Sequence, residues 1–112
     1  DNQKARHDEL MTELSQGLAA FLQDVLRELV GPTNVRTFEP TMSAEDFSFM
    51  LEAKAGCYFM IGNGDGDHRH AGHGMGPCML HNPSFDFNDA LIPIGASAWV
   101  RLAQAWLSHE KI

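Results

Sequence analysis

The sequence is poor in cysteine, in basic residues and in long apolar runs. Only two of its 112 residues are cysteine, too few for the disulfide framework of a small secreted domain. Its eight Lys and Arg residues stand against 15 Asp and Glu and form no cluster, which disfavours nucleic acid and anionic membranes as partners. No apolar run approaches the roughly 20 residues that a membrane span needs. We therefore expect neither a nucleic-acid partner nor a membrane partner.

The N-terminal residues carry no targeting pattern. DNQKARHDE is polar and lacks the apolar segment of a signal peptide. Six Met and two Cys suit a reducing compartment, so we expect reduced thiols and a cytoplasmic protein. Because the chain begins with Asp1, we expect a fragment, a trimmed chain or a processed product. Its length and its hydrophobic content of 44% suit one domain or part of one.

The hydrophobic pattern predicts an α/β fold. Apolar residues at steps of three and four predict helices over residues 7–30 and from residue 89 or 93 to about 108. The predicted strands are residues 35–38 and the segment CYFMIG, residues 57–62, which is apolar on both faces, as in the middle of a sheet. With a short helix between the strands, the order is helix, strand, helix, strand, loop, helix. This order predicts part of a layered α/β sheet.

The short helix is predicted in the segment TMSAEDFSFML. Ser43 is placed to cap it, with Asp46 three residues further on, and Glu45 and Asp46 suit the positive end of the helix dipole. The free N–H groups of this helix start could also hold an anion. From the residues alone, an ordinary helix cap is the simpler interpretation.

Four histidines lie in one glycine-rich segment, IGNGDGDHRHAGHGMGPCMLHNPSFDFND, residues 61–89. Its first glycines and aspartates fit neither an EF-hand loop nor a dinucleotide-binding loop. The two cysteines and the histidines match no standard zinc-finger spacing. We interpret His68, His70 and His73 as histidines of a solvated loop.

The fourth histidine, His81, stands between an apolar stretch and the last helix. Pro83 stiffens the chain and two alternating phenylalanines anchor it, so the imidazole would be presented rigidly, as a metal ligand is. From the residues alone, an ordinary core or surface histidine remains the simpler interpretation. Three polar residues that follow could orient His81 or cap the last helix, and we favour the cap: Asp86, Asn88 and Asp89.

Three motifs occur in order between about residues 22 and 107: PTMSAEDFSFML, GCYFMIGNGDG and GHGMGPCMLHNPSFDFNDALIPIGASAWVRLAQAWL. Together they resemble the C-terminal segment of M20-family metallopeptidases. The most similar branch is the bacterial amidohydrolases of the hippurate hydrolase and aminoacylase type. The resemblance implies that residues 1–112 are the C-terminal portion of a layered α/β catalytic domain, without its lid domain and its N-terminal portion.

The resemblance also implies a function. Members hydrolyse the amide bond of N-acyl amino acids, such as hippurate, with water activated by two divalent metal ions per subunit. Zinc is the usual metal, and manganese, cobalt or nickel also occur. The histidine of the family's LHNPxFDFND motif binds a metal, which assigns that role to His81. Ser43 and Glu45 are carried over as substrate-pocket residues.

What the segment lacks follows from the same resemblance. The catalytic base and the other ligands belong to sequence upstream of the lid, so no catalytic residue is expected here and the isolated chain is expected to be inactive. Neither Cys57 nor Cys78 lies in the motif of the family's cysteine ligand, and both are expected to be inert thiols. The implied partners are the small-molecule amide substrate and the rest of the parent catalytic domain. Assembly of the protein into a homo-oligomer is a further open alternative. The alternative is a non-enzymatic module that binds a metal or mediates oligomerisation.

Overall fold

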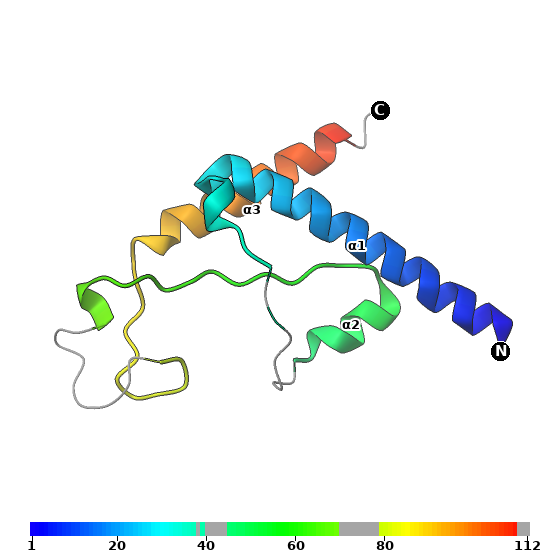
Figure 1. Cartoon of the computed structure of the whole chain (residues 1–112), viewed down its shortest axis with the longest axis horizontal. Coiled ribbons are helices and arrows are strands. Elements are labelled where there is room, and N and C mark those ends of the chain that lie inside the picture. Colours follow the sequence, from blue (N-terminus) through cyan, green and yellow to red (C-terminus); the bar gives the residue numbers. More distant parts are fainter. Residues whose placement is uncertain (38, 40–44, 70–78, 110–112) are drawn as a thin grey trace.

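The structure is a computed structural model that describes residues 1–37, 39, 45–69 and 79–109. Figure 1 shows its elements, which in chain order are α1 (Asn2–Val30), the 3-10 helix η1 (Pro32–Asn34), α2 (Phe47–Ala53), the 3-10 helix η2 (Asp67–Arg69) and α3 (Leu91–His109). The long helices predicted near both ends of the chain are confirmed, and α1 begins earlier than its apolar pattern. No described helix combines the length and the apolar character that crossing a bilayer requires.

Caps at both ends define α1. The Asp1 side chain accepts a hydrogen bond from the Gln3 N–H at 3.1 Å, which lets the helix start ahead of the apolar pattern. At the other end Gly31 adopts φ 90°, and its N–H donates to the Arg27 carbonyl at 2.9 Å. Pro32 follows and cannot continue the helix, so α1 ends there.

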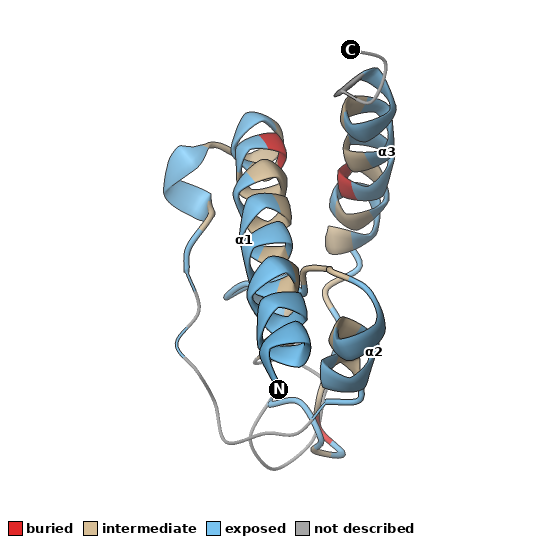
Figure 2. Ribbon diagram, turned by 90° about the vertical axis from the view of Figure 1, so that its right-hand side faces the viewer, coloured by how far each residue is buried: buried red, intermediate tan, exposed pale blue. Residues whose placement is uncertain are grey.

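The helices α1 and α3 lie side by side (Figure 2). Each contributes one buried apolar residue, Val25 from α1 at 8% exposure and Ala98 from α3 at 4%. The rings of Phe21 and Trp106 meet edge to face, with centroids 5.4 Å apart. These contacts pack α3 against α1.

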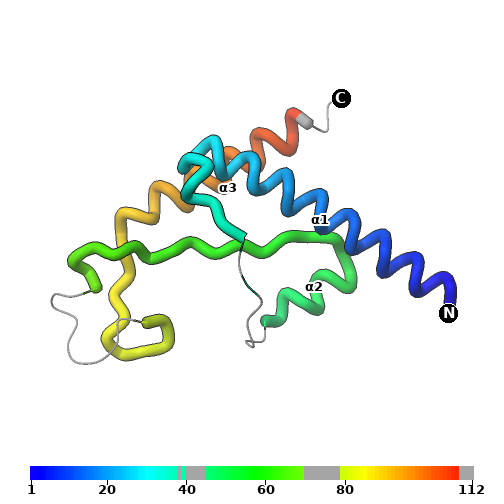
Figure 3. Tube along the Cα trace, in the orientation of Figure 1, coloured from blue at the N-terminus to red at the C-terminus, as the bar shows by residue number. Residues whose placement is uncertain are grey.

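The segment between α2 and η2 runs extended alongside the helices (Figure 3). Its side chains alternate between two sides, as they do in a strand. Cys57 and Phe59 are half-buried, and the Phe59 ring lies 5.4 Å from that of Trp99 on α3. Tyr58 and Met60 point the other way and are 52% and 59% exposed. The segment therefore has one side packed on helices and one side open.

The two predicted strands are not confirmed within the described residues. Residues 57–62 are extended, but no ladder of backbone hydrogen bonds joins them to another described segment, and that ladder is what makes a strand. In the other predicted strand, Val35 has extended dihedrals, φ −107° and ψ 119°, whereas Phe38 lies outside the described residues. The layered α/β sheet is therefore not formed within the described residues, where only helices and extended chain occur.

Apolar surface remains uncovered over much of the chain. The accessible surface is 9328 Å², whereas a compact protein of 12.4 kDa exposes about 6100 Å². The radius of gyration is 17.6 Å, compared with about 13 Å for a compact domain of this length. Large apolar side chains that are more than half exposed include Leu10 on α1, Phe49 on α2 and Trp99 on α3. The helices thus present apolar faces that the chain itself leaves open.

Candidate functional site

His81 is exposed and has a left-handed backbone. Its φ of 69° is the one positive value among the described residues other than glycine. This conformation costs roughly 1–2 kcal/mol for an ordinary L-residue, although histidine adopts it more often than most. The chain therefore reverses sharply at His81, and contacts around it have to hold the reversal in place.

A turn of residues 79–85, here called the His81 turn, is held by the side chain of Asn82. Its Nδ2 donates to the carbonyls of Met79 and Leu80, both at 3.2 Å. The Asn82 carbonyl in turn accepts from the Phe85 N–H at 3.0 Å. Hydrogen bonds thus hold the backbone on both sides of His81, as a rigidly presented imidazole requires.

Further hydrogen bonds tie the chain after this turn to the extended segment. Asn63 Oδ1 accepts from the Asn88 N–H at 2.9 Å, and Asn63 Nδ2 donates to the Asp86 carbonyl at 2.9 Å. Asn88 Nδ2 donates to the Asn63 carbonyl at 3.2 Å. These three bonds are here called the asparagine clamp. Asn88 also caps α3, because its Oδ1 accepts from the Ala90 N–H at 3.1 Å, which confirms the predicted cap.

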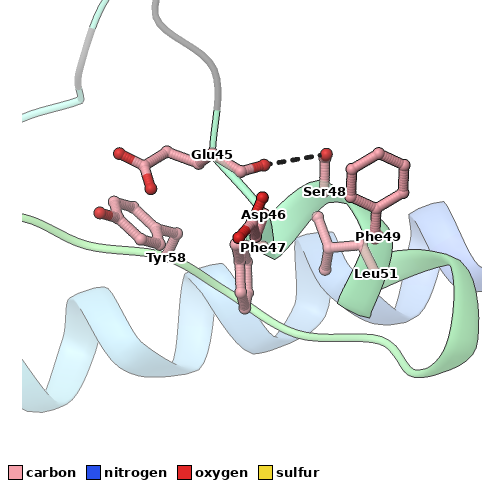
Figure 4. Close-up of a pocket in the computed structure, with 7 residues that line it drawn as sticks. All are labelled: Glu45, Asp46, Phe47, Ser48, Phe49, Leu51 and Tyr58. Carbon is pink, nitrogen blue, oxygen red and sulfur yellow. Dashed lines mark hydrogen bonds between the residues drawn. The ribbon is translucent and has the colours of Figure 1, made fainter.

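Glu45 lies elsewhere, at an open pocket of about 480 Å³ beside α2 (Figure 4). Phe47 and Tyr58 also line this pocket, with ring centroids 5.4 Å apart. The lining does not include His81, and Figure 1 places α2 and the His81 turn at opposite ends of the extended segment. The structure therefore does not bring Glu45 and His81 together.

The predicted start of the short helix is wrong. α2 begins at Phe47, so Glu45 precedes it, and the N-cap Asp46 makes no side-chain cap hydrogen bond. Ser48 Oγ instead donates to the Glu45 carbonyl at 3.0 Å, so Ser48 satisfies the backbone just ahead of the helix (Figure 4). Ser43, the predicted cap and pocket residue, lies outside the described residues.

His68 is half-buried, so the solvated-loop interpretation is wrong for this residue. Its Nε2 is shielded from solvent and has no hydrogen-bond partner within the described part of the chain. The ring lies close to the loop backbone, since a Cβ built on Gly66 would lie 3.0 Å from His68 Nδ1. His70 and His73 lie outside the described residues.

Cys57 has the surroundings of an inert thiol. It is a free cysteine in an apolar groove of about 350 Å³ that Phe21 and Trp99 also line. Burial raises the pKa of the Cys57 thiol above its ordinary value. A metal ligand has to be a thiolate, so this environment disfavours metal binding by Cys57. Cys78 lies outside the described residues.

The described His, Cys, Asp and Glu side chains can supply one ligand to a metal ion, but they do not form a complete metal centre. Among residues 1–37, 39, 45–69 and 79–109, no three His, Cys, Asp or Glu side chains are grouped so that they could hold an ion. A catalytic zinc takes about three protein ligands and keeps one open position. His81, exposed on a hydrogen-bonded turn, has the chemistry of one such ligand.

The sequence reasoning missed Asn63 and Asn82. A local signal existed for both, because Asn63 lies between two glycines and Asn82 precedes Pro83. In such settings an asparagine side chain often bonds to nearby backbone. The pairing of Asn63 with Asn88 had no such signal, because the two residues are far apart in the chain.

Comparison with known proteins gives the family. The profile of Peptidase family M20/M25/M40 matches residues 3–105. Hippurate hydrolase of Campylobacter jejuni is 33% identical over 88 residues, which cover 78% of this chain and 20% of that protein. IAA-amino acid hydrolase ILR1-like 4 of Arabidopsis thaliana is 29% identical over 97 residues, which cover 86% of this chain and 20% of that protein.

The chain spans about a fifth of the length of the curated relatives it matches. No solved structure matches it. The family profile covers most of the residues, and the motif that contains His81 lies within the matched range. On this basis the chain belongs to Peptidase family M20/M25/M40, a family with hydrolases among its members.

Proposed function

We propose that the chain is the C-terminal portion of the catalytic domain of a metal-dependent amidohydrolase. The whole protein would hydrolyse the amide bond of N-acyl amino acids. The observation that carries the proposal is the exposed His81 imidazole on a hydrogen-bonded turn, in a chain of this peptidase family. The names of the two relatives support the substrate class, since each specifies a substrate with an acyl group joined to an amino acid.

His81 would supply one ligand to the metal centre. A neutral imidazole binds divalent metals through one ring nitrogen. When bound, two zinc ions, or manganese, cobalt or nickel, supply an activated water and an electrophile for the amide carbonyl. The chain's own contribution is to hold the imidazole still, through the Asn82 bonds and the asparagine clamp.

Glu45, together with Ser43, would line the substrate pocket. The described pocket combines the Glu45 carboxylate with the rings of Phe47 and Tyr58, a mixture that suits a substrate with an apolar acyl group and a polar amide. In the described chain this pocket lies away from His81, so the binding role of Glu45 requires that the whole protein bring the two together.

The extended segment of residues 57–62 would become a strand of the layered α/β sheet in the whole protein. Helices already cover one of its sides, while Tyr58 and Met60 are exposed on the other. Neighbouring strands from the rest of the catalytic domain would pair with its backbone. The same assembly would cover apolar side chains that are now open, such as Trp99.

The test compares variants of the full-length protein. His81→Ala is expected to lose bound metal and to lower kcat/KM for an N-acyl amino acid by about 100-fold or more. The control is His7→Ala, an exposed histidine on α1, which is expected to retain wild-type metal content and activity. Glu45→Gln is expected to raise KM while the metal content stays unchanged. Equal metal content in His81→Ala and the wild type would contradict the proposal.

The isolated chain provides a second check. Alone, it is expected to show no hydrolysis of an N-acyl amino acid, because it lacks most of the ligands. Activity of the purified 112-residue chain would contradict the assignment as a segment. Tight binding of one zinc ion per isolated chain would favour an independent metal-binding module instead.

A further inference from the structure

We infer that Asn63 is a positioning residue for the His81 imidazole and acts through the asparagine clamp. The inference rests on the proposed function, because the clamp has this role only if His81 binds a metal. Asn63 works through the backbone: its side chain joins the extended segment to the chain that leads from the His81 turn into α3.

The bonds of Asn82 fix the shape of the His81 turn but leave its position undetermined. All of them are local, and their partners are Met79, Leu80 and Phe85. A turn held only by such bonds could move as one unit relative to the helices. Besides the burial of Ser84 at 4% exposure, a bond to a distant part of the chain would help to fix where the imidazole lies.

The asparagine clamp provides that connection. Asn63 uses both ends of its side-chain amide, accepting from the Asn88 N–H and donating to the Asp86 carbonyl, each at 2.9 Å. Asn88 completes the pairing with a bond to the Asn63 carbonyl. Both asparagines are half-buried, which partly shields their mutual bonds from competing water.

Gly64 allows the two segments to approach this closely. Its φ of +76° lies in the region that favours glycine. A Cβ at this position would lie 3.2 Å from Asn88 Nδ2, which is tighter than an ordinary contact. A residue with a side chain at position 64 would therefore disturb the asparagine clamp.

At its other end the clamp is anchored on α3. Besides bonding Asn63, Asn88 accepts from the Ala90 N–H through Oδ1 and from the Leu91 N–H through its carbonyl. Hydrogen bonds thereby connect the chain that follows the His81 turn both to α3 and to the extended segment. Metal ligands have to be held close to their productive geometry, and losing a residue that orients a ligand typically weakens metal affinity by about 10- to 100-fold.

The experiment measures zinc binding to the metal-free full-length protein. Asn63→Ala is expected to weaken zinc affinity by about 10- to 100-fold. Activity is expected to return at saturating zinc with an unchanged KM, because substrate binding is not altered. Hydrogen exchange of the Asn88 amide, measured without metal, is expected to accelerate because that amide loses its acceptor, Asn63 Oδ1.

The matched control is Asn34→Ala. It removes a side-chain hydrogen bond of similar length, from Asn34 Nδ2 to the Val30 carbonyl at 2.7 Å, at the end of α1. It is expected to leave zinc affinity and Asn88 exchange at wild-type values. Asn63→Asp keeps the acceptor for Asn88 but loses the donor to Asp86, so its zinc affinity is expected to lie between those of the wild type and Asn63→Ala.

Two results overturn the inference. One is a zinc affinity within twofold of the wild type in Asn63→Ala while the Asn88 amide exchanges faster. The second applies if Asn63→Ala does not fold, and it is a wild-type zinc affinity in both Asn63→Asp and Asn88→Asp. Asn88→Asp is informative because it retains the cap of α3 and loses only the hydrogen-bond donor to the Asn63 carbonyl. Failure of the proposed function is distinguishable, because His81→Ala would then bind zinc as tightly as the wild type.

Discussion

The α1–α3 interface is built from apolar side chains, whereas the His81 turn is held by three asparagines. Ala98 and Phe21 contribute to the first by burial and ring contact. Asn63, Asn82 and Asn88 hold the second by directed hydrogen bonds. Apolar burial depends on area and tolerates small shifts, while a hydrogen bond depends steeply on distance and angle. The α1–α3 interface therefore contributes mainly to the stability of the fold, and the hydrogen bonds of the His81 turn contribute mainly to the position of the imidazole.

This comparison predicts that substitutions in the two regions change different measurements. In the turn, metal affinity and kcat/KM should fall with little loss of thermal stability. In the helix interface, thermal stability should fall while the metal affinity of the folded protein is retained. If substitutions in one region lowered metal affinity and thermal stability equally, the distinction between the two regions would not hold.

After His81 itself, the largest effect is expected at Asn82. Asn82→Ala removes two side-chain bonds to the backbone before His81 and is expected to lower kcat/KM of the full-length protein by about 10- to 100-fold. Steady-state kinetics at several zinc concentrations measures this loss, and thermal unfolding should change little. A large fall in melting temperature with unchanged zinc affinity would assign Asn82 to the stability of the fold instead.

A stability effect of intermediate size is expected at Ala98. This residue is 4% exposed where α3 faces α1, so Ala98→Leu would overpack the interface and cost about 1–3 kcal/mol. Chemical denaturation of the full-length protein measures the loss. The control is Ala96→Leu on an exposed position of the same helix, where a change within about 0.5 kcal/mol is expected. Equal losses at both positions would show that the α1–α3 contact is not a packed interface.

The smallest effect concerns the Cys57 thiol. Burial raises its pKa, so the folded protein keeps the proton at a pH where the unfolded chain has begun to lose it. Stability should therefore fall slightly as the pH rises through the ordinary range of a free thiol and beyond. Alkylation of Cys57 with iodoacetamide at pH 8, followed by peptide mass spectrometry, should be slower in the folded protein than in denaturant. Equal rates would show that the groove does not shield the thiol.

The helices could be predicted from the sequence because their information is local. Apolar spacing predicts α1 and α3, and a cap of the last helix is predicted from Asp86, Asn88 or Asp89, of which Asn88 accepts from the Ala90 N–H. The predicted strand at residues 57–62 is not confirmed, because its information is not local. Its residues favour extended chain, but a strand also needs a neighbouring strand, which the described residues do not provide.

The site was only partly predictable. The resemblance to M20 metallopeptidases pointed to His81, and the family assignment is confirmed. The metal role of His81 and the pocket roles of Ser43 and Glu45 stay predictions. The asparagine clamp was not foreseeable, because no local pattern links Asn63 to Asn88 across the loop between them.

Diffraction from crystals of the full-length protein grown with zinc, with anomalous data collected at the zinc edge, tests the account most directly. We predict that a ring nitrogen of His81 lies about 2.0–2.1 Å from a zinc ion whose other ligands come from residues outside this chain. A His81 ring turned to bulk solvent, or directed away from the ions, would contradict the account.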